Sequence, residues 1–113
     1  MITVYHNPRC TKSRQALAYL ENKNLDFEVI KYLDHPLSKN ELEDLLTKLN
    51  IKPISLIRKN EATWKETFKG RTLSDTQIIE AMIQYPKLME RPIVVKKDKA
   101  IIARPTENID NLI

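Results

Sequence analysis

The first part of the chain constrains the fold most, because a strand, a sharp turn and a helix follow one another directly. Ile2 and Val4 fit a short β-strand, and the Asn7-Pro8 pair ends it. The stretch from Thr11 to Lys23 carries apolar residues at helical spacing. A helix is therefore predicted to begin at or just after position 10.

The one cysteine of the chain, Cys10, lies at this turn. Its thiol would face the open N–H groups and the positive end of the helix dipole, a setting that favours the reactive thiolate. Arg9, Lys12 and Arg14 add positive charge, so the turn is also a candidate anion site. A lone cysteine in a small protein is usually a buried, inert side chain. The charged neighbours favour the reactive interpretation here.

Composition limits the classes of protein that remain. A chain of 113 residues is expected to form one domain, and 42% hydrophobic with 30% charged residues is ordinary for a globular protein. We find no apolar run of membrane-helix length and no export signal, and one cysteine cannot form an internal disulfide, so we expect a reducing cytoplasm. The net charge of +4 comes from scattered lysines, so neither a membrane nor direct nucleic-acid binding is indicated.

The rest of the chain divides into predicted elements. A second strand is predicted over Asp26–Tyr32, and capping boxes begin helices at Ser38 and Ser74. Residues 54–71 show no clean period and are predicted to form short helical turns. The final part is predicted to contain two strands joined by the charged turn 96–99, followed by a short helix capped by Thr106.

The order of these elements predicts an α/β fold. One helix between the first two strands makes a βαβ unit with parallel strands, and the last two strands make an antiparallel hairpin. We expect one domain over 1–113, built as β-α-β, a helical insertion at about 37–90, then β-β-α, around a mixed four-stranded sheet. In such a sheet the first and third strands are neighbours.

Three arginines stand out by placement, and two of them directly precede a proline, where the backbone is held extended. Arg91 stands just before the third strand, whose start can face the end of the first strand, so the topology alone makes it plausible beside Cys10. The topology does not demonstrate the same for Arg58 or Arg104. A solvated surface charge is the ordinary alternative for any single arginine.

The segments YHNPRCTKSR, LIRKN, MERPIVV and ARPTE together resemble the glutaredoxin-linked arsenate reductase (ArsC) family, most closely its short chromosomal members. The resemblance spans essentially the whole chain and implies a thioredoxin-like fold. Two departures from plasmid-type members are visible. Thr11-Lys12 stands where those members typically carry Gly-Thr, and the chain ends at Ile113 without their C-terminal extension.

The resemblance assigns roles to individual residues. Cys10 matches the nucleophile that forms a covalent thioarsenate, His6 a histidine that supports it, and Ser13 a serine near the thiolate. Pro92 matches the cis-proline of thioredoxin-like folds. The oxyanion-binding arginines are matched by Arg58, Arg91 and Arg104.

Chemistry agrees with this assignment, because arginine presents a planar fork of donors that suits tetrahedral oxyanions such as arsenate. Reduction of As(V) to As(III) takes two electrons, and a single thiol cannot supply both as a disulfide. Glutathione as co-substrate and a glutaredoxin as partner are therefore expected, with no bound cofactor.

Other interpretations differ in class. A phosphatase loop needs an arginine six positions after the cysteine, whereas Arg14 is four after, and Cys10, His6 and His35 make no metal-ligand cluster. His6 could instead cap a turn. Two alternatives stay open: a glutathione-dependent thiol reductase for another substrate, and an Spx-like regulator that binds RNA polymerase without catalysis. Such regulators typically carry two cysteines in a C-x-x-C motif, whereas this chain has Ser13 at the position of the second cysteine.

Overall fold

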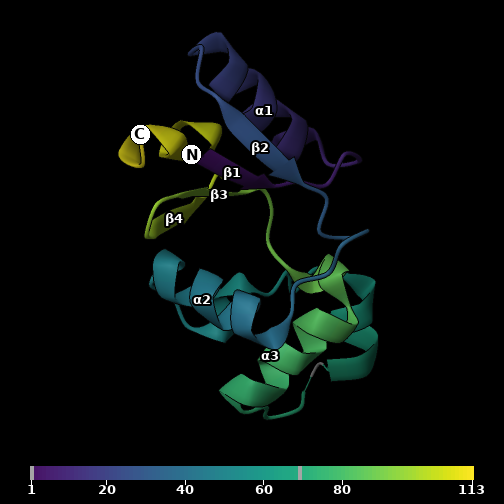
Figure 1. Cartoon of the computed structure of the whole chain (residues 1–113). Helices are drawn as coiled ribbons and strands as arrows, with labels where there is room; N and C mark the ends of the chain where they lie inside the picture. The colour runs from purple at the N-terminus through teal and green to yellow at the C-terminus, as the bar shows by residue number, and fades with distance from the viewer. Residues whose placement is uncertain (1, 69) are drawn as a thin grey trace. The chain divides into compact units, whose positions relative to one another are not determined.

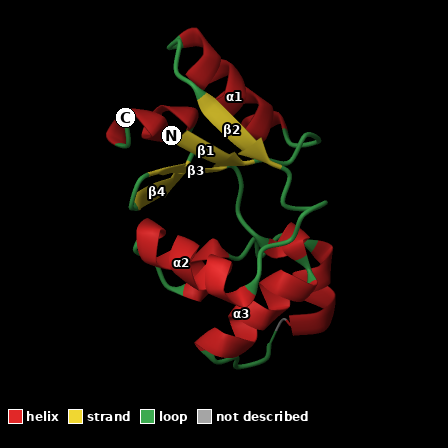
Figure 2. Cartoon of the chain, in the orientation of Figure 1, coloured by secondary structure: helices red, strands yellow, loops and turns green. Residues whose placement is uncertain are grey.

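The computed structural model describes residues 2–68 and 70–113. These residues form two compact units, one made of residues up to 35 together with 91–113 and the other of 36–90. The first unit contains the sheet and the second is helical (Figures 1 and 2).

The sheet has four strands in the order β2-β1-β3-β4. They are β1 (Ile2–Tyr5), β2 (Phe27–Ile30), β3 (Ile93–Lys96) and β4 (Lys99–Ile102). β1 runs parallel to β2 and antiparallel to β3, and β3 with β4 forms an antiparallel hairpin. The predicted mixed sheet is confirmed, including the pairing of the first and third strands, although β2 is shorter than predicted.

One core cluster joins this sheet to two helical elements, α1 (Thr11–Asn22) and the 3₁₀ helix η4 (Thr106–Asn111). The alternation of β1 turns Ile2 and Val4 toward the buried Ala16 and Leu20 of α1. Val94, Ala103 and Ile109 complete the cluster. This cluster therefore packs α1, the helix that starts beside Cys10, against the sheet.

The predicted cap of the C-terminal helix is wrong. Thr106 is the first residue of η4, and the capping position falls on Pro105, which has no side-chain oxygen to accept a hydrogen bond. The side-chain amide of Asn108 instead donates to the carbonyls of Ile102 and Arg104 (3.2 and 3.1 Å), which ties this helix to the end of β4.

The second unit contains α2 (Lys39–Leu49) and α3 (Asp75–Gln84), each begun by the predicted capping box. The irregular region 54–71 contains two of the predicted short helical turns, η1 (Pro53–Leu56) at its start and the π-helical η2 (Trp64–Phe68). A further short turn, η3 (Pro86–Leu88), follows α3. An isolated bridge pairs Ile57 with Met89. Trp64 stacks on Phe68 at 5.6 Å between ring centroids.

In the described parts of the chain, no helix combines the length and apolar character that a bilayer span requires.

Candidate active site

Cys10 is the N-cap residue of α1, with extended backbone angles (φ −94°, ψ 122°). This position places its side chain at the end of the helix where backbone N–H groups are unsatisfied. The backbone N–H of Cys10 donates to the Asn7 carbonyl (3.0 Å), and its own carbonyl accepts from the N–H of Arg14 (3.1 Å). The half-buried thiol therefore sits on a fixed backbone.

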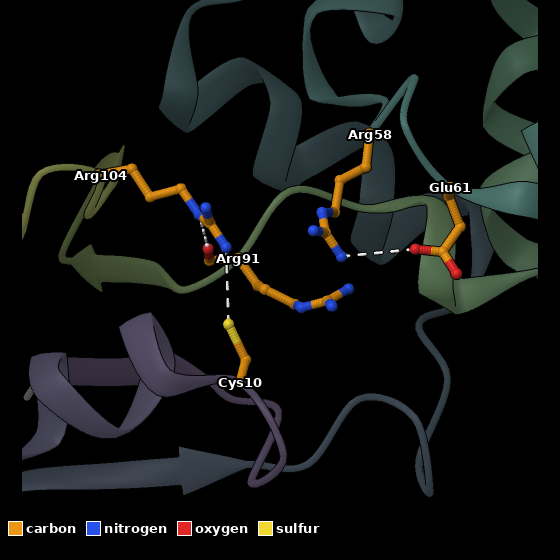
Figure 3. Close-up of polar contacts among 5 residues, drawn as sticks. All are labelled: Cys10, Arg58, Glu61, Arg91 and Arg104. Atoms are coloured by element: carbon orange, nitrogen blue, oxygen red, sulfur yellow. Dashed lines mark hydrogen bonds and ion pairs between the residues drawn. The ribbon is translucent and has the colours of Figure 1, made fainter.

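Arg104 lies beside the sulfur (Figure 3). Its Nη2 donates to Cys10 Sγ (3.5 Å), and its Nε donates to the Arg91 carbonyl (2.6 Å). The second bond orients the guanidinium, because it holds Arg104 to the backbone just before β3 while the far end of the side chain faces the thiol. Both the Arg91–Pro92 and the Arg104–Pro105 bonds are cis, and the first confirms the prediction for Pro92.

Opposing influences act on the Cys10 thiol. Burial raises its pKa, whereas the backbone N–H of Ser13, hydrogen bonding and charge from Arg91, and the N–H of Lys12 lower it. The net result is a pKa below the ordinary value. The pKa of Arg91 is in turn raised: burial opposes this, but Cys10 and Tyr32 favour the charged guanidinium. The thiolate and the guanidinium therefore stabilise each other.

Ser13 is fully buried in the first turn of α1, and its Oγ accepts a hydrogen bond from the backbone N–H of Asn7 (3.2 Å). The hydroxyl thus braces the turn, while the Ser13 backbone N–H acts on the Cys10 sulfur. The two functions come from one residue at the third position of the helix.

His6 is buried, with 5% of its surface exposed. Its backbone N–H donates to the Ile30 carbonyl (2.9 Å), and within the described residues its Nδ1 has no hydrogen-bond partner. Burial, and then the positive charges of Lys31 and Arg14, lower the pKa of its imidazole. These influences favour the neutral imidazole. The predicted support of the cysteine by His6 remains a prediction.

Arg58 belongs to the other compact unit. There its Nη1 pairs with Glu61 Oε2 at 3.4 Å (Figure 3). Its backbone N–H donates to the Leu88 carbonyl (2.7 Å). The structure brings Cys10, Ser13, Arg91 and Arg104 together within one unit. The oxyanion role of Arg58 stays a prediction from resemblance.

Sequence reasoning missed two groups at this site. Tyr32 follows β2 and acts on Arg91, but nothing in its sequence neighbourhood indicates that role. Asn7 organises the turn through its backbone and side chain, and the Asn-Pro pair did signal a turn there. Among the described residues, no group of three or more His, Cys, Asp or Glu side chains could hold a metal ion.

Comparison with known proteins agrees with this arrangement. The model of the ArsC family matches residues 5–112. The chain is 40% identical over 111 residues to an arsenate reductase of Neisseria meningitidis, a match that covers 96% of this chain and 95% of the relative. It is 37% identical over 110 residues to an arsenate reductase of Haemophilus influenzae, covering 96% and 95%. A solved arsenate reductase from Vibrio cholerae superposes with a TM-score of 0.94 at 40% identity, covering 99% of this chain and 97% of that one. The chain belongs to the ArsC family and has its thioredoxin-like fold.

Proposed function

We propose that this protein reduces arsenate to arsenite, with Cys10 as the nucleophile and external thiols as the source of electrons. The observation that carries the proposal is the contact of Arg104 with the Cys10 sulfur at the N-terminus of α1. A thiolate and an arginine fork in one place suit attack on an oxyanion. Relatives of the same family that are named arsenate reductases support the choice of arsenate.

The first step is attack of the Cys10 sulfur on arsenic. A sulfur–arsenic bond forms, one arsenic–oxygen bond breaks, and the released oxygen leaves as water after it takes up protons. Arg91 and Arg104 donate to the remaining oxygens and stabilise the charge on them. Arsenic is still As(V) in this covalent thioarsenate.

The two electrons come from outside the chain, because Cys10 has no second cysteine here with which to form a disulfide. Glutathione supplies the thiols, and a glutaredoxin resolves the adduct that glutathione forms with the thioarsenate. Overall, dianionic arsenate, two glutathione thiols and two protons give arsenite, glutathione disulfide and one water. Cys10 returns as a thiolate for the next cycle.

Coupled oxidation of NADPH tests this proposal. The purified protein is assayed with arsenate, glutathione, glutathione reductase and a glutaredoxin, and each component is omitted in turn. Turnover is expected only when all are present. Equal turnover with thioredoxin and thioredoxin reductase in place of the glutathione system would overturn the proposed electron source.

The same assay separates the alternatives. NADPH oxidation with a mixed disulfide in place of arsenate, and with no added glutaredoxin, would indicate a thiol reductase. No oxidation in either arm would leave the non-enzymatic, RNA polymerase-binding alternative.

A further inference from the structure

Asn7 lies in the turn between β1 and α1, with 6% of its surface exposed. It takes part in hydrogen bonds to three nearby residues. Its carbonyl accepts from the backbone N–H of Cys10 (3.0 Å), and its Oδ1 accepts from the backbone N–H of Arg9 (3.0 Å). Its own N–H donates to Ser13 Oγ (3.2 Å). Asn7 therefore holds the turn on both sides of the cysteine.

These bonds connect Asn7 to the groups that stabilise the thiolate. Ser13 accepts from Asn7 through its hydroxyl and acts on the Cys10 sulfur through its backbone N–H. The N–H of Cys10, bonded to Asn7, fixes where the extended N-cap residue begins. A shift of Asn7 would therefore move the sulfur relative to the helix end and to Arg104.

The side chain of Asn7 has a specific task in this arrangement. Its Oδ1 satisfies the N–H of the residue two positions later, as asparagine side chains do in tight turns. The bond is part-buried, so its loss is not fully compensated by water.

We propose that Asn7 is a positioning residue that holds Cys10 at the start of α1. It acts through the turn backbone and Ser13. The proposal concerns the site of the proposed function, but its main test reads the thiol itself and needs no arsenate.

Asn7→Ala and Asn7→Ser form a matched pair that differs by one hydroxyl oxygen. In Asn7→Ala the Cys10 thiol should titrate closer to the free-cysteine value of about 8.5. Its alkylation by iodoacetamide at pH 7 should be about three- to tenfold slower than in wild type, since one hydrogen bond is lost. Asn7→Ser should restore part of both properties, because serine makes the same turn bond more weakly. The measurement is the pH dependence of the alkylation rate, with circular dichroism to verify folding.

Asn50→Ala is the control. Asn50 ends α2 with a left-handed φ of 56°, so its replacement should lower Tm without moving the thiol titration. If Asn7→Ala does not fold, Asn7→Thr and Asn7→Val give a second isosteric pair, in which only threonine offers an acceptor. Identical titration curves in a folded pair, or a wild-type curve in Asn7→Ala, would overturn the proposal.

A kinetic experiment relates the positioning role of Asn7 to arsenate turnover. In the coupled assay, Asn7→Ala should lower kcat/KM for arsenate by about the same factor as alkylation. Lack of arsenate turnover in the wild type would refute the proposed function and leave the positioning role to be decided by alkylation.

Discussion

The thiol of Cys10 experiences burial, which favours the neutral form, and a set of donors and charges that favours the thiolate. Arg91 appears among the latter both as a hydrogen-bond donor and as a charge. Arg104 contacts the same sulfur. At the scale of single residues, the reactivity of this site depends on which set dominates.

The lowered pKa of Cys10 has a direct consequence for reactivity. We expect the alkylation rate of the wild-type thiol to rise through a midpoint below that of an unperturbed cysteine thiol. In Arg91→Ala the midpoint should move up, because both the hydrogen bond and the positive charge are lost. The measurement is the iodoacetamide rate from pH 5 to 10. A wild-type midpoint at or above that of Arg91→Ala would contradict the assignment.

The same shift links pH to stability. A lowered folded-state pKa means that the ionised Cys10 stabilises the protein above the ordinary thiol pKa. This contribution is lost as pH falls through the lowered folded-state value. The difference in Tm between wild type and Cys10→Ser should therefore shift in favour of wild type as pH rises from about 6 to 9.

Replacement of the site arginines should affect turnover more than stability. Arg91→Ala and Arg104→Ala should each lower kcat/KM for arsenate by about tenfold to a hundredfold, since a charge-assisted hydrogen bond contributes about 1.5–3 kcal/mol. Lysine at either position should rescue only part, because it retains the charge and loses the fork. Coupled-assay kinetics with melting curves give the answer.

Arg9→Ala and Arg71→Ala are the controls for that series. Arg9 is exposed, and Arg71 lies over the Phe68 ring in the other unit. Equal losses at all four positions would indicate a diffuse positive field without a built oxyanion site. Arg14 is unsuitable as a control because it donates to the Pro8 carbonyl (2.9 Å) and to Thr11 Oγ1 (3.2 Å), within the cysteine turn.

At the scale of elements, α1 begins differently from α2 and α3. α2 and α3 carry complete capping boxes at Ser38 and Ser74, whereas α1 has Cys10 at its N-cap. In α2 and α3 the serine side chain accepts one of the backbone N–H groups at the start of its own helix. Cys10 makes no such capping bond, so the start of α1 remains available to stabilise the thiolate, which suits the proposed reaction.

Removal of a serine cap should cost stability alone. Ser38→Ala and Ser74→Ala should each lower the free energy of unfolding by about 1 kcal/mol, because the serine Oγ that accepts the backbone N–H three residues later is lost. Urea denaturation measures this, and kcat/KM for arsenate should stay within error of wild type. A change in Cys10 alkylation on either substitution would be evidence against the separation of cap and site.

Some of these features could be predicted from the sequence, and others could not. Capping boxes, the strand–turn–helix around Cys10 and the pairing of β1 with β3 follow from local patterns and chain topology. The bond from Arg104 to the Arg91 carbonyl depends on how β3 and β4 pair, which local patterns do not encode. Thr106 was predicted as a cap from its residue type, but Pro105 takes that position.

At the scale of the whole molecule, an N-terminal segment and a C-terminal segment of the chain belong to one compact unit. Tyr19 of α1 donates to Asp110 Oδ1 (2.6 Å), and Lys23 pairs with the same carboxylate at 3.5 Å. This contact joins the helix that carries Cys10 to η4, which follows Arg104. It therefore helps to hold together the segments on which the candidate site is built.

Tyr19→Phe tests this connection. The bond to Asp110 raises the pKa of Tyr19 to about 12, so the neutral phenol stabilises the folded state. This contribution is present below the ordinary tyrosine pKa of about 10 and is lost as pH rises toward the folded value. Wild type should melt at a higher temperature than Tyr19→Phe at pH 7, and the gap should narrow above pH 10. A gap that widens with pH would contradict the assigned bond.

Arsenite formation by wild type and Cys10→Ser, measured side by side, tests the central claim most directly. Both proteins are supplied with arsenate, glutathione and a glutaredoxin, and arsenite is quantified after matched circular dichroism spectra verify folding. Wild type is expected to produce arsenite, and Cys10→Ser is expected to give only the background of the assay, because serine is not ionised at pH 7 and cannot form the sulfur–arsenic bond. Arsenite production by Cys10→Ser at the wild-type rate would show that the nucleophile lies elsewhere.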